Sequence, residues 1–123
     1  MFETISVKTA IKLSQEGRAV LYDIRDEISY RKGHLPMARN KSKEVLEKEL
    51  SRNPELQRGS VLIVLYCDYG NQSMRVAKEL SEKGYRGIAS MVGGYHAYEG
   101  YVEMKKNNLW TMEWKKRGES GNS

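Results

Sequence analysis

The sequence predicts an α/β protein with three layers, in which a central parallel sheet of about five strands has helices on both faces. Three observations lead to this fold class. Short apolar runs typical of strands alternate along the chain with segments of helical periodicity. Strands that alternate with helices pair in parallel through right-handed crossovers. The chain of 123 residues is long enough for one domain with one modest core.

Each expected element has a local signal. Apolar runs of strand length, either alternating or continuous, predict strands over residues 2–7, 19–24, 61–66 and 88–92. Helical periodicity, with polar residues that can cap the first turn or glycines that can end the last, predicts helices over residues 6–17, 26–33, 42–50, 73–83 and 95–104. The elements therefore alternate between strand and helix along most of the chain.

The connections and the chain end are less regular. Pro36 disfavours a helix and predicts an extended link over residues 34–38, and Asn53-Pro54 predicts a turn. We expect one domain over residues 1–106 and a C-terminal extension over 107–123. In that extension, alternating Trp110, Met112 and Trp114 predict a strand or tail packed on the domain, and the last residues, 117–123, are expected to be disordered.

Composition narrows the possible functions. The formal charge is +5, but many basic residues are interleaved with glutamates, and no basic stripe with regular aromatics is present, so we expect small anionic substrates and no nucleic acid. No apolar run is long enough to span a membrane, and the first residues lack a secretory signal. One cysteine can form neither an internal disulfide nor a thiolate-rich zinc site, which predicts a cytoplasmic protein.

The single cysteine, Cys67, follows the apolar run 61–66 and precedes a turn that leads into a helix. A thiol at the carboxyl end of a buried strand, beside a helix amino terminus, faces converging backbone N–H groups. Those donors and the helix dipole favour the thiolate over the thiol. Cys67 is therefore a candidate nucleophile, and the alternative is an inert buried thiol that packs as a small hydrophobe.

Four segments together resemble the rhodanese family of sulfurtransferases, over roughly residues 4–102. They are similar to the family's Asp-x-Arg, its Gly-His-Ile-Pro-Gly-Ala, its active-site loop and its Gly-Gly-aromatic step, in the same order. The segments are Asp23-Ile24-Arg25, Gly33-His34-Leu35-Pro36-Met37-Ala38, Tyr66-Cys67-Asp68-Tyr69-Gly70-Asn71-Gln72-Ser73 and Gly93-Gly94-Tyr95. The resemblance implies a rhodanese-like three-layer domain.

The resemblance also implies a reaction. The Cys67 thiolate would take the outer sulfur of thiosulfate or a persulfide-type donor, and a thiol or cyanide acceptor would then remove it from the Cys67 persulfide. The loop that follows would cradle the negative terminal sulfur with its backbone N–H groups. Its residues are Asp68, Tyr69, Gly70, Asn71, Gln72 and Ser73. The reaction requires no metal and no organic cofactor.

Two loop residues depart from the family pattern. Gln72 stands where many members carry Arg, and Asp68 adds a carboxylate directly after the nucleophile. Both changes weaken the attraction of a doubly charged donor, so we expect a natural donor other than thiosulfate.

Other polar residues have two interpretations each. Asp23 and Arg25 either form a structural ion pair or line the pocket, and Arg75 either aids anion binding or is merely solvated. His34 could act as a base, but in the similar family motif it holds the link in place. His96 is expected at the surface.

Two other functions compete with sulfur transfer. A phosphatase or arsenate reductase of related fold would place Arg six residues after the cysteine, where this chain has Ser73. A non-enzymatic or weakly active module, either a sulfur relay that docks a protein partner or a thiol sensor, is compatible with Cys67 and with the basic tail.

Overall fold

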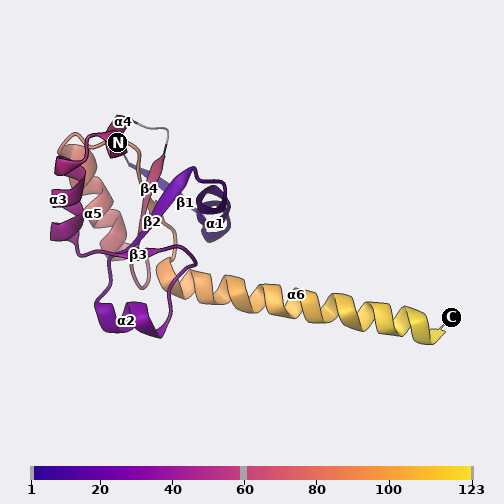
Figure 1. The fold of residues 1–123 in the computed structure, drawn as a ribbon. Helices are drawn as coiled ribbons and strands as arrows, with labels where there is room; N and C mark the ends of the chain where they lie inside the picture. Colours follow the sequence, from indigo (N-terminus) through magenta and orange to yellow (C-terminus); the bar gives the residue numbers. More distant parts are fainter. Residues whose placement is uncertain (1, 59–60, 123) are drawn as a thin grey trace.

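In the part of the chain that the structure describes, five parallel strands form one sheet in the order β1-β5-β4-β2-β3 (Figure 1). The computed structural model describes residues 2–58 and 61–122, with side chains described for residues 2–57 and 61–108. The strands are β1 (Glu3–Ile5), β2 (Ala19–Asp23), β3 (Arg39–Asn40), β4 (Leu62–Tyr66) and β5 (Ile88–Met91). The predicted parallel sheet is confirmed, with β4 at its centre.

Helices cover both faces of this sheet (Figure 1). They are α1 (Val7–Gln15), α2 (Glu27–Lys32), α3 (Lys43–Arg52), α4 (Glu55–Arg58), α5 (Asn71–Glu82) and α6 (Gly94–Asn122). One core cluster joins the sheet to Leu46 on α3 and Leu80 on α5. The second cluster joins the opposite face to Ala10 on α1, with Tyr98 of α6 packed against it. The chain therefore has the three layers that the sequence predicts.

Side-chain caps explain where three of the helices begin. Ser6, Asp26 and Ser42 have extended backbones, and each side chain accepts a hydrogen bond from the N–H group three residues later. α5 begins differently, because its N-terminal flanking residue is Gly70, which has no side chain to cap the helix. The first N–H groups of α5 are thus left for another acceptor.

The structure contains two short elements that the sequence does not predict, and it corrects the strand predicted over residues 110–114. The two-residue β3 and the one-turn α4 were not predicted, because both are too short to show periodicity. The backbone over Trp110, Met112 and Trp114 is helical and not extended, since α6 continues to Asn122 and extends beyond the domain (Figure 1). A helix satisfies its own backbone hydrogen bonds, whereas a strand needs a neighbour. Side chains from residue 109 on, and Ser123, lie outside the described residues, so their predicted packing and disorder stay predictions.

The link before β3 is a turn and not the extended segment that the sequence predicts. The N–H of Ala38 donates to the carbonyl of Leu35 at 3.1 Å, and Pro36 and Met37 occupy the two central positions. Met37 has a φ of 67°, the left-handed conformation that the third residue of a type II turn requires. Proline disfavours a helical conformation in the residue before it, which is the basis of the prediction of an extended link. Proline is also common at the second position of a turn, and Pro36 occupies that position here.

Met37→Gly is expected to raise the free energy of unfolding by about 0.5–1 kcal/mol, because glycine adopts positive φ without steric strain. The greater conformational freedom of glycine in the unfolded chain offsets part of that gain. The Met37 side chain is 68% exposed, so little packing is lost. Urea denaturation measures the change, and Met37→Ala is the control because alanine keeps the Cβ. Equal stabilities of the glycine and alanine variants would contradict the strain argument.

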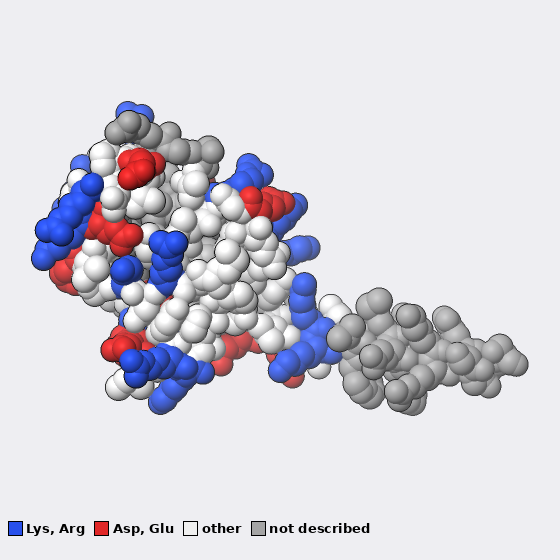
Figure 2. All heavy atoms as spheres, viewed as in Figure 1, with Lys and Arg blue, Asp and Glu red and all other residues white. Residues whose placement is uncertain are grey.

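The surface carries mixed charge. On the face drawn in Figure 2, basic and acidic side chains are interspersed around a band of uncharged side chains, and no continuous basic stripe crosses that face. Among the residues that the structure describes, every helix is too short or too polar to cross a lipid bilayer.

Candidate active site

Cys67 lies directly after β4, at the carboxyl edge of the sheet, where the sequence predicts it. Its side chain is only 3% exposed, yet it forms part of the wall of a pocket of about 160 Å³. The residues that line this pocket are Cys67, Asp68, Tyr69, Asn71 and Gln72. The Cys67 side chain is therefore held tightly by the protein, and the residue contributes to the wall of a small pocket.

Backbone N–H groups converge on this sulfur. The N–H groups of Gly70 and Ser73 donate to Cys67 Sγ at 3.2 and 3.3 Å, and Ser73 Oγ lies 3.5 Å from the same atom. The loop can curl around the sulfur because Gly70 has a φ of 99°, a left-handed conformation that suits glycine. We call the two N–H groups together with the Ser73 hydroxyl the sulfur cradle.

The sulfur cradle changes the acidity of Cys67. Burial raises the pKa of the Cys67 thiol, but hydrogen bonds from the Ser73 hydroxyl and from the N–H groups of Ser73, Gly70 and Tyr69 outweigh it, so this pKa lies below its ordinary value. At neutral pH a larger fraction of Cys67 is thiolate than in an unperturbed cysteine. Any reaction of this thiolate therefore slows as the pH falls through the lowered pKa.

The start of α6 holds the other side of the loop. The N–H groups of Tyr95 and His96 donate to the carbonyls of Cys67 and Asp68 at 2.8 and 3.0 Å. A side chain at Gly94 would collide with the Cys67 carbonyl, so only glycine permits this close approach. Because the loop carbonyls bond to α6, its N–H groups remain directed towards the sulfur.

Asp23 and Arg25 form a buried ion pair behind the loop. Arg25 Nε and Nη2 donate to the Asp23 carboxylate, with Nη2 at 2.7 Å, and Nη2 also donates to the carbonyl of Gly33. The guanidinium lies 4.1 Å from the centre of the Tyr95 ring. Neither Asp23 nor Arg25 lines the Cys67 pocket. The geometry favours the structural interpretation of this pair.

The charged residues near the pocket are few. Asp68 is exposed, and its carboxylate lies 3.7 Å from Arg25 Nη1, which offsets part of its charge. Arg75 is exposed on α5 and does not line the pocket. Apart from the Cys67 thiolate, Asp68 is the charged residue among the described lining residues, and it is negative.

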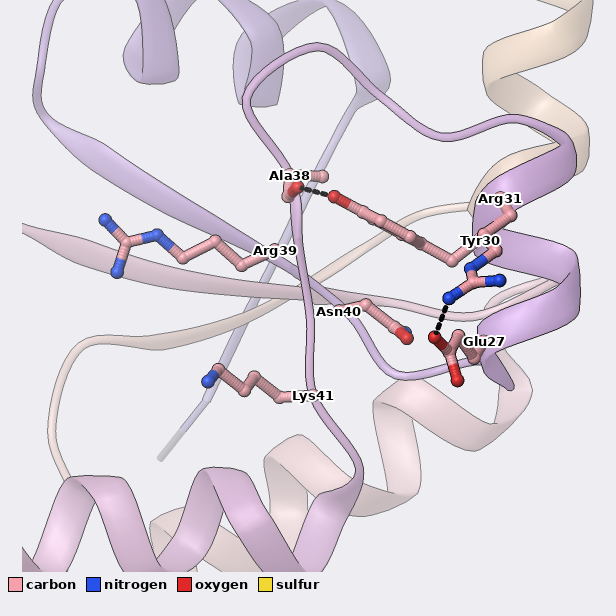
Figure 3. A pocket seen from close by; sticks show the side chains of 7 residues that line it. All are labelled: Glu27, Tyr30, Arg31, Ala38, Arg39, Asn40 and Lys41. Atoms are coloured by element: carbon pink, nitrogen blue, oxygen red, sulfur yellow. Dashed lines mark hydrogen bonds and ion pairs between the residues drawn. The ribbon is translucent and has the colours of Figure 1, made fainter.

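A larger pocket lies beside β3, away from Cys67. It has a volume of about 640 Å³, and its lining residues are Glu27, Tyr30, Arg31, Ala38, Arg39, Asn40 and Lys41 (Figure 3). In Figure 3 the Tyr30 hydroxyl donates to the carbonyl of Ala38, and Arg31 pairs with Glu27, while Arg39 and Lys41 extend away from that pair. This pocket has a larger volume, but its lining holds no thiol, and Asn40 and Lys41 bond to groups outside the lining. Cys67 therefore stays the candidate reactive residue.

The described side chains contain no cluster of three or more His, Cys, Asp or Glu residues arranged to hold a metal ion. The chemistry that the Cys67 site can supply is that of a stabilised thiolate facing a small pocket.

A family model described as the rhodanese-like domain matches residues 6–101. The chain belongs to the rhodanese-like domain family. The family match covers all four of the motif segments that suggested the resemblance, and it agrees with the position of the cysteine loop between β4 and α5.

Solved structures share the rhodanese-like fold. A protein of unknown function from Rhodopseudomonas palustris, described as a possible tyrosine phosphatase, is 28% identical, with a TM-score of 0.69 and 82% of each chain covered. A rhodanese-like domain from Anabaena is 21% identical, with a TM-score of 0.67, covering 82% of this chain and 76% of that one. The human single-domain sulfurtransferase is 23% identical, with a TM-score of 0.63, covering 79% and 95%. These similarities confirm the predicted fold class.

Two histidines of this rhodanese-like domain lie where the sequence places them. His34 Nδ1 is 2.8 Å from the carbonyl of Tyr30, and the two rings stack, which fits a role in holding the link. His96 is exposed as expected. Its ring also lies 5.2 Å from that of Tyr69 in the cysteine loop, a proximity that the sequence does not reveal.

Sequence reasoning also missed Ser90. This serine is fully buried on β5, and its Oγ lies 2.8 Å from Ser73 Oγ in the sulfur cradle of the rhodanese-like domain. The available signal was a hydroxyl within a strand that is otherwise apolar, Ile88-Ala89-Ser90-Met91, because a buried polar group requires a partner.

Proposed function

We propose that this rhodanese-like domain is a sulfurtransferase that carries sulfane sulfur as a persulfide on Cys67. The observation that supports the proposal most strongly is the pair of N–H groups, from Gly70 and Ser73, directed at Cys67 Sγ. A lowered thiol pKa supplies the nucleophile near neutral pH. The same N–H donors can stabilise the negative terminal sulfur of a persulfide.

The reaction proceeds by two displacements. In the first, the Cys67 thiolate attacks the outer sulfur of the donor, the new S–S bond forms, and the donor's S–S bond breaks with its electron pair leaving on sulfite or on a thiolate. In the second, a thiolate or cyanide attacks the terminal sulfur and the Cys67 thiolate departs. Each displacement forms one bond to the transferred sulfur and breaks another, so the reaction needs no external oxidant or reductant.

The pocket favours a donor of low charge. Its formally charged lining residue is the Asp68 carboxylate, and Gln72 offers hydrogen bonds without a positive charge. A doubly charged thiosulfate gains little attraction in such a pocket, whereas the reacting end of a thiol persulfide carries at most one negative charge. The proposed donor is therefore a persulfide-type compound, with thiosulfate as a weaker substitute. The proposal assigns this activity to residues 1–106, with 107–123 as an extension, in a cytoplasm that keeps the lone thiol reduced.

Phosphoryl transfer is the second enzymatic candidate, because a similar structure is described as a possible tyrosine phosphatase. The residue six places after Cys67 is Ser73, and its side chain is buried against Ser90. Arg75 is exposed and outside the pocket lining, so this loop offers no guanidinium to a phosphate. These observations argue against the phosphatase.

Mass spectrometry of the intact protein tests the proposal. After incubation with thiosulfate or with glutathione persulfide, we expect a mass increase of one sulfur atom that cyanide removes, and no increase in Cys67→Ser. An unmodified Cys67 under both donors would refute sulfur transfer. Turnover of an aryl phosphate would favour the phosphatase instead. A stable protein complex together with an unreactive thiol would favour a non-enzymatic module.

A further inference from the structure

Ser90 occupies an unusual place beneath the cysteine loop. It lies on the central part of the sheet, opposite Leu65 of β4, and its side chain is fully buried. On its face of β5 the alternate residue Ile88 packs into the apolar cluster beneath α5. A hydroxyl buried in such surroundings is costly unless it is hydrogen-bonded, and Ser90 Oγ lies 2.8 Å from Ser73 Oγ.

We infer that Ser90 is a positioning residue whose O–H donates to Ser73 Oγ, which leaves the Ser73 proton free to turn towards Cys67 when that thiol ionises. The inference deepens the proposed function and rests on it for its catalytic meaning. The contacts that carry it join the side chains of Cys67, Ser73 and Ser90 and the carbonyl of Gly70, and each is 3.5 Å or shorter.

Proton counting in the thiol form leads to this assignment. Among the described residues, Ser73 Oγ contacts three groups, which are Cys67 Sγ, the carbonyl of Gly70 at 3.2 Å and Ser90 Oγ. The carbonyl can only accept, so Ser73 donates its single proton there. The Cys67 S–H and the Ser90 O–H then both donate to Ser73 Oγ. The protons of Cys67, Ser73 and Ser90 thus make one hydrogen bond each, and all three contacts of Ser73 Oγ are satisfied.

The thiolate form has one proton fewer. Sγ can now only accept, so the Ser73 O–H turns from the Gly70 carbonyl to the sulfur. Ser73 Oγ no longer receives the S–H, and Ser90 is the donor that remains to it. If Ser90 lacked a hydroxyl, Ser73 Oγ would accept nothing in the thiolate form but would still accept the S–H in the thiol form. Loss of the Ser90 hydroxyl therefore destabilises the thiolate selectively.

Charged neighbours do not enter this hydroxyl chain. The titratable or charged side chains on the loop, next to it in sequence or bonded to it include Asp68 and Tyr69 in the loop, Tyr66 on β4, Arg75 on α5, Asp23 and Arg25 at the end of β2, and Tyr95 and His96 at the start of α6. Asp68 pairs with Arg25, and Tyr69 contacts His96. A substitution at Ser90 leaves those contacts in place.

The test is the pH dependence of alkylation of Cys67 by iodoacetamide, which reports one thiol because the chain has one cysteine. In Ser90→Ala we expect the midpoint of the rate profile to rise by about 0.5–1 pH unit. Ser90→Thr, which keeps the hydroxyl, is expected to restore the midpoint. Ser14→Ala removes another buried serine hydroxyl, on α1, and is expected to leave the midpoint unchanged.

A double-mutant cycle decides whether Ser90 acts through Ser73. In a Ser73→Ala background, Ser90→Ala is expected to cause no further shift. An unchanged midpoint in Ser90→Ala, or an equal shift in both backgrounds, would overturn the inference. If Ser90→Ala does not fold, the matched pair Ser90→Thr and Ser90→Val gives the same comparison. Absence of the persulfide adduct on Cys67 would refute sulfur transfer but not the role of Ser90. An unchanged midpoint of the alkylation profile would refute the role of Ser90 but not sulfur transfer.

Discussion

Asp23→Ala is expected to lower the free energy of unfolding by about 3–5 kcal/mol, the cost of leaving a buried charge without its partner. The Asp23 side chain is fully buried, and that of Arg25 is 5% exposed. Arg25 would retain only the carbonyl of Gly33 and the more distant Asp68 as acceptors. Urea denaturation followed by circular dichroism measures the loss.

A surface ion pair of the same chemistry provides the control. Glu27 and Arg31 pair on α2 with both side chains largely exposed, and Glu27→Ala is expected to cost at most about 1 kcal/mol. If Asp23→Ala lowered the free energy of unfolding no more than Glu27→Ala, the buried pair of Asp23 and Arg25 would not contribute more to stability than a surface pair. Asp23→Leu tests whether the charge or the volume matters, because leucine fills the space and still leaves Arg25 unpaired.

Gln72→Arg is expected to raise kcat/KM for thiosulfate by about tenfold, because a charged donor at the pocket rim adds a charge-assisted hydrogen bond to the dianion. Gln72 lines the same pocket as Cys67 and Asp68. The gain should shrink as salt is added, since this side chain is exposed. Steady-state cyanolysis with thiosulfate measures the rate.

Two variants separate the added charge from other effects of this substitution. Gln72→Met removes the amide without adding charge and is expected to give no gain. Arg75→Ala removes a cation outside the pocket lining and is expected to change the rate little. A rate in folded Gln72→Arg that is unchanged or lower than that of the native protein would count against this loop as the donor site.

The sequence predicts the position of Cys67 because the signals that place it are local. An apolar run ends there and a helical pattern follows, so the strand end and the helix start can be assigned without knowing the fold. The N–H donors of Gly70 and Ser73 follow from the same short segment. The four motif segments of the rhodanese-like family then supply the topology.

Other parts of the site depend on contacts between distant segments. Ser90 reaches Ser73 only because β5 lies beside β4, and no local pattern gives that order of strands. Tyr95 stacks on Arg25 although the two are far apart in the chain. β3 is too short for its periodicity to be seen, and its existence depends on pairing with β2.

The pairing of β1 with β5 has a consequence for biosynthesis. Glu3 lies opposite Ala89, so the sheet cannot close until nearly the whole domain has left the ribosome. The N–H groups of Tyr95 and His96, which hold the loop carbonyls, emerge later still. These two residues are thus the last part of the loop's support to be synthesised. The order of synthesis therefore places the support of the cysteine loop after every strand of the sheet.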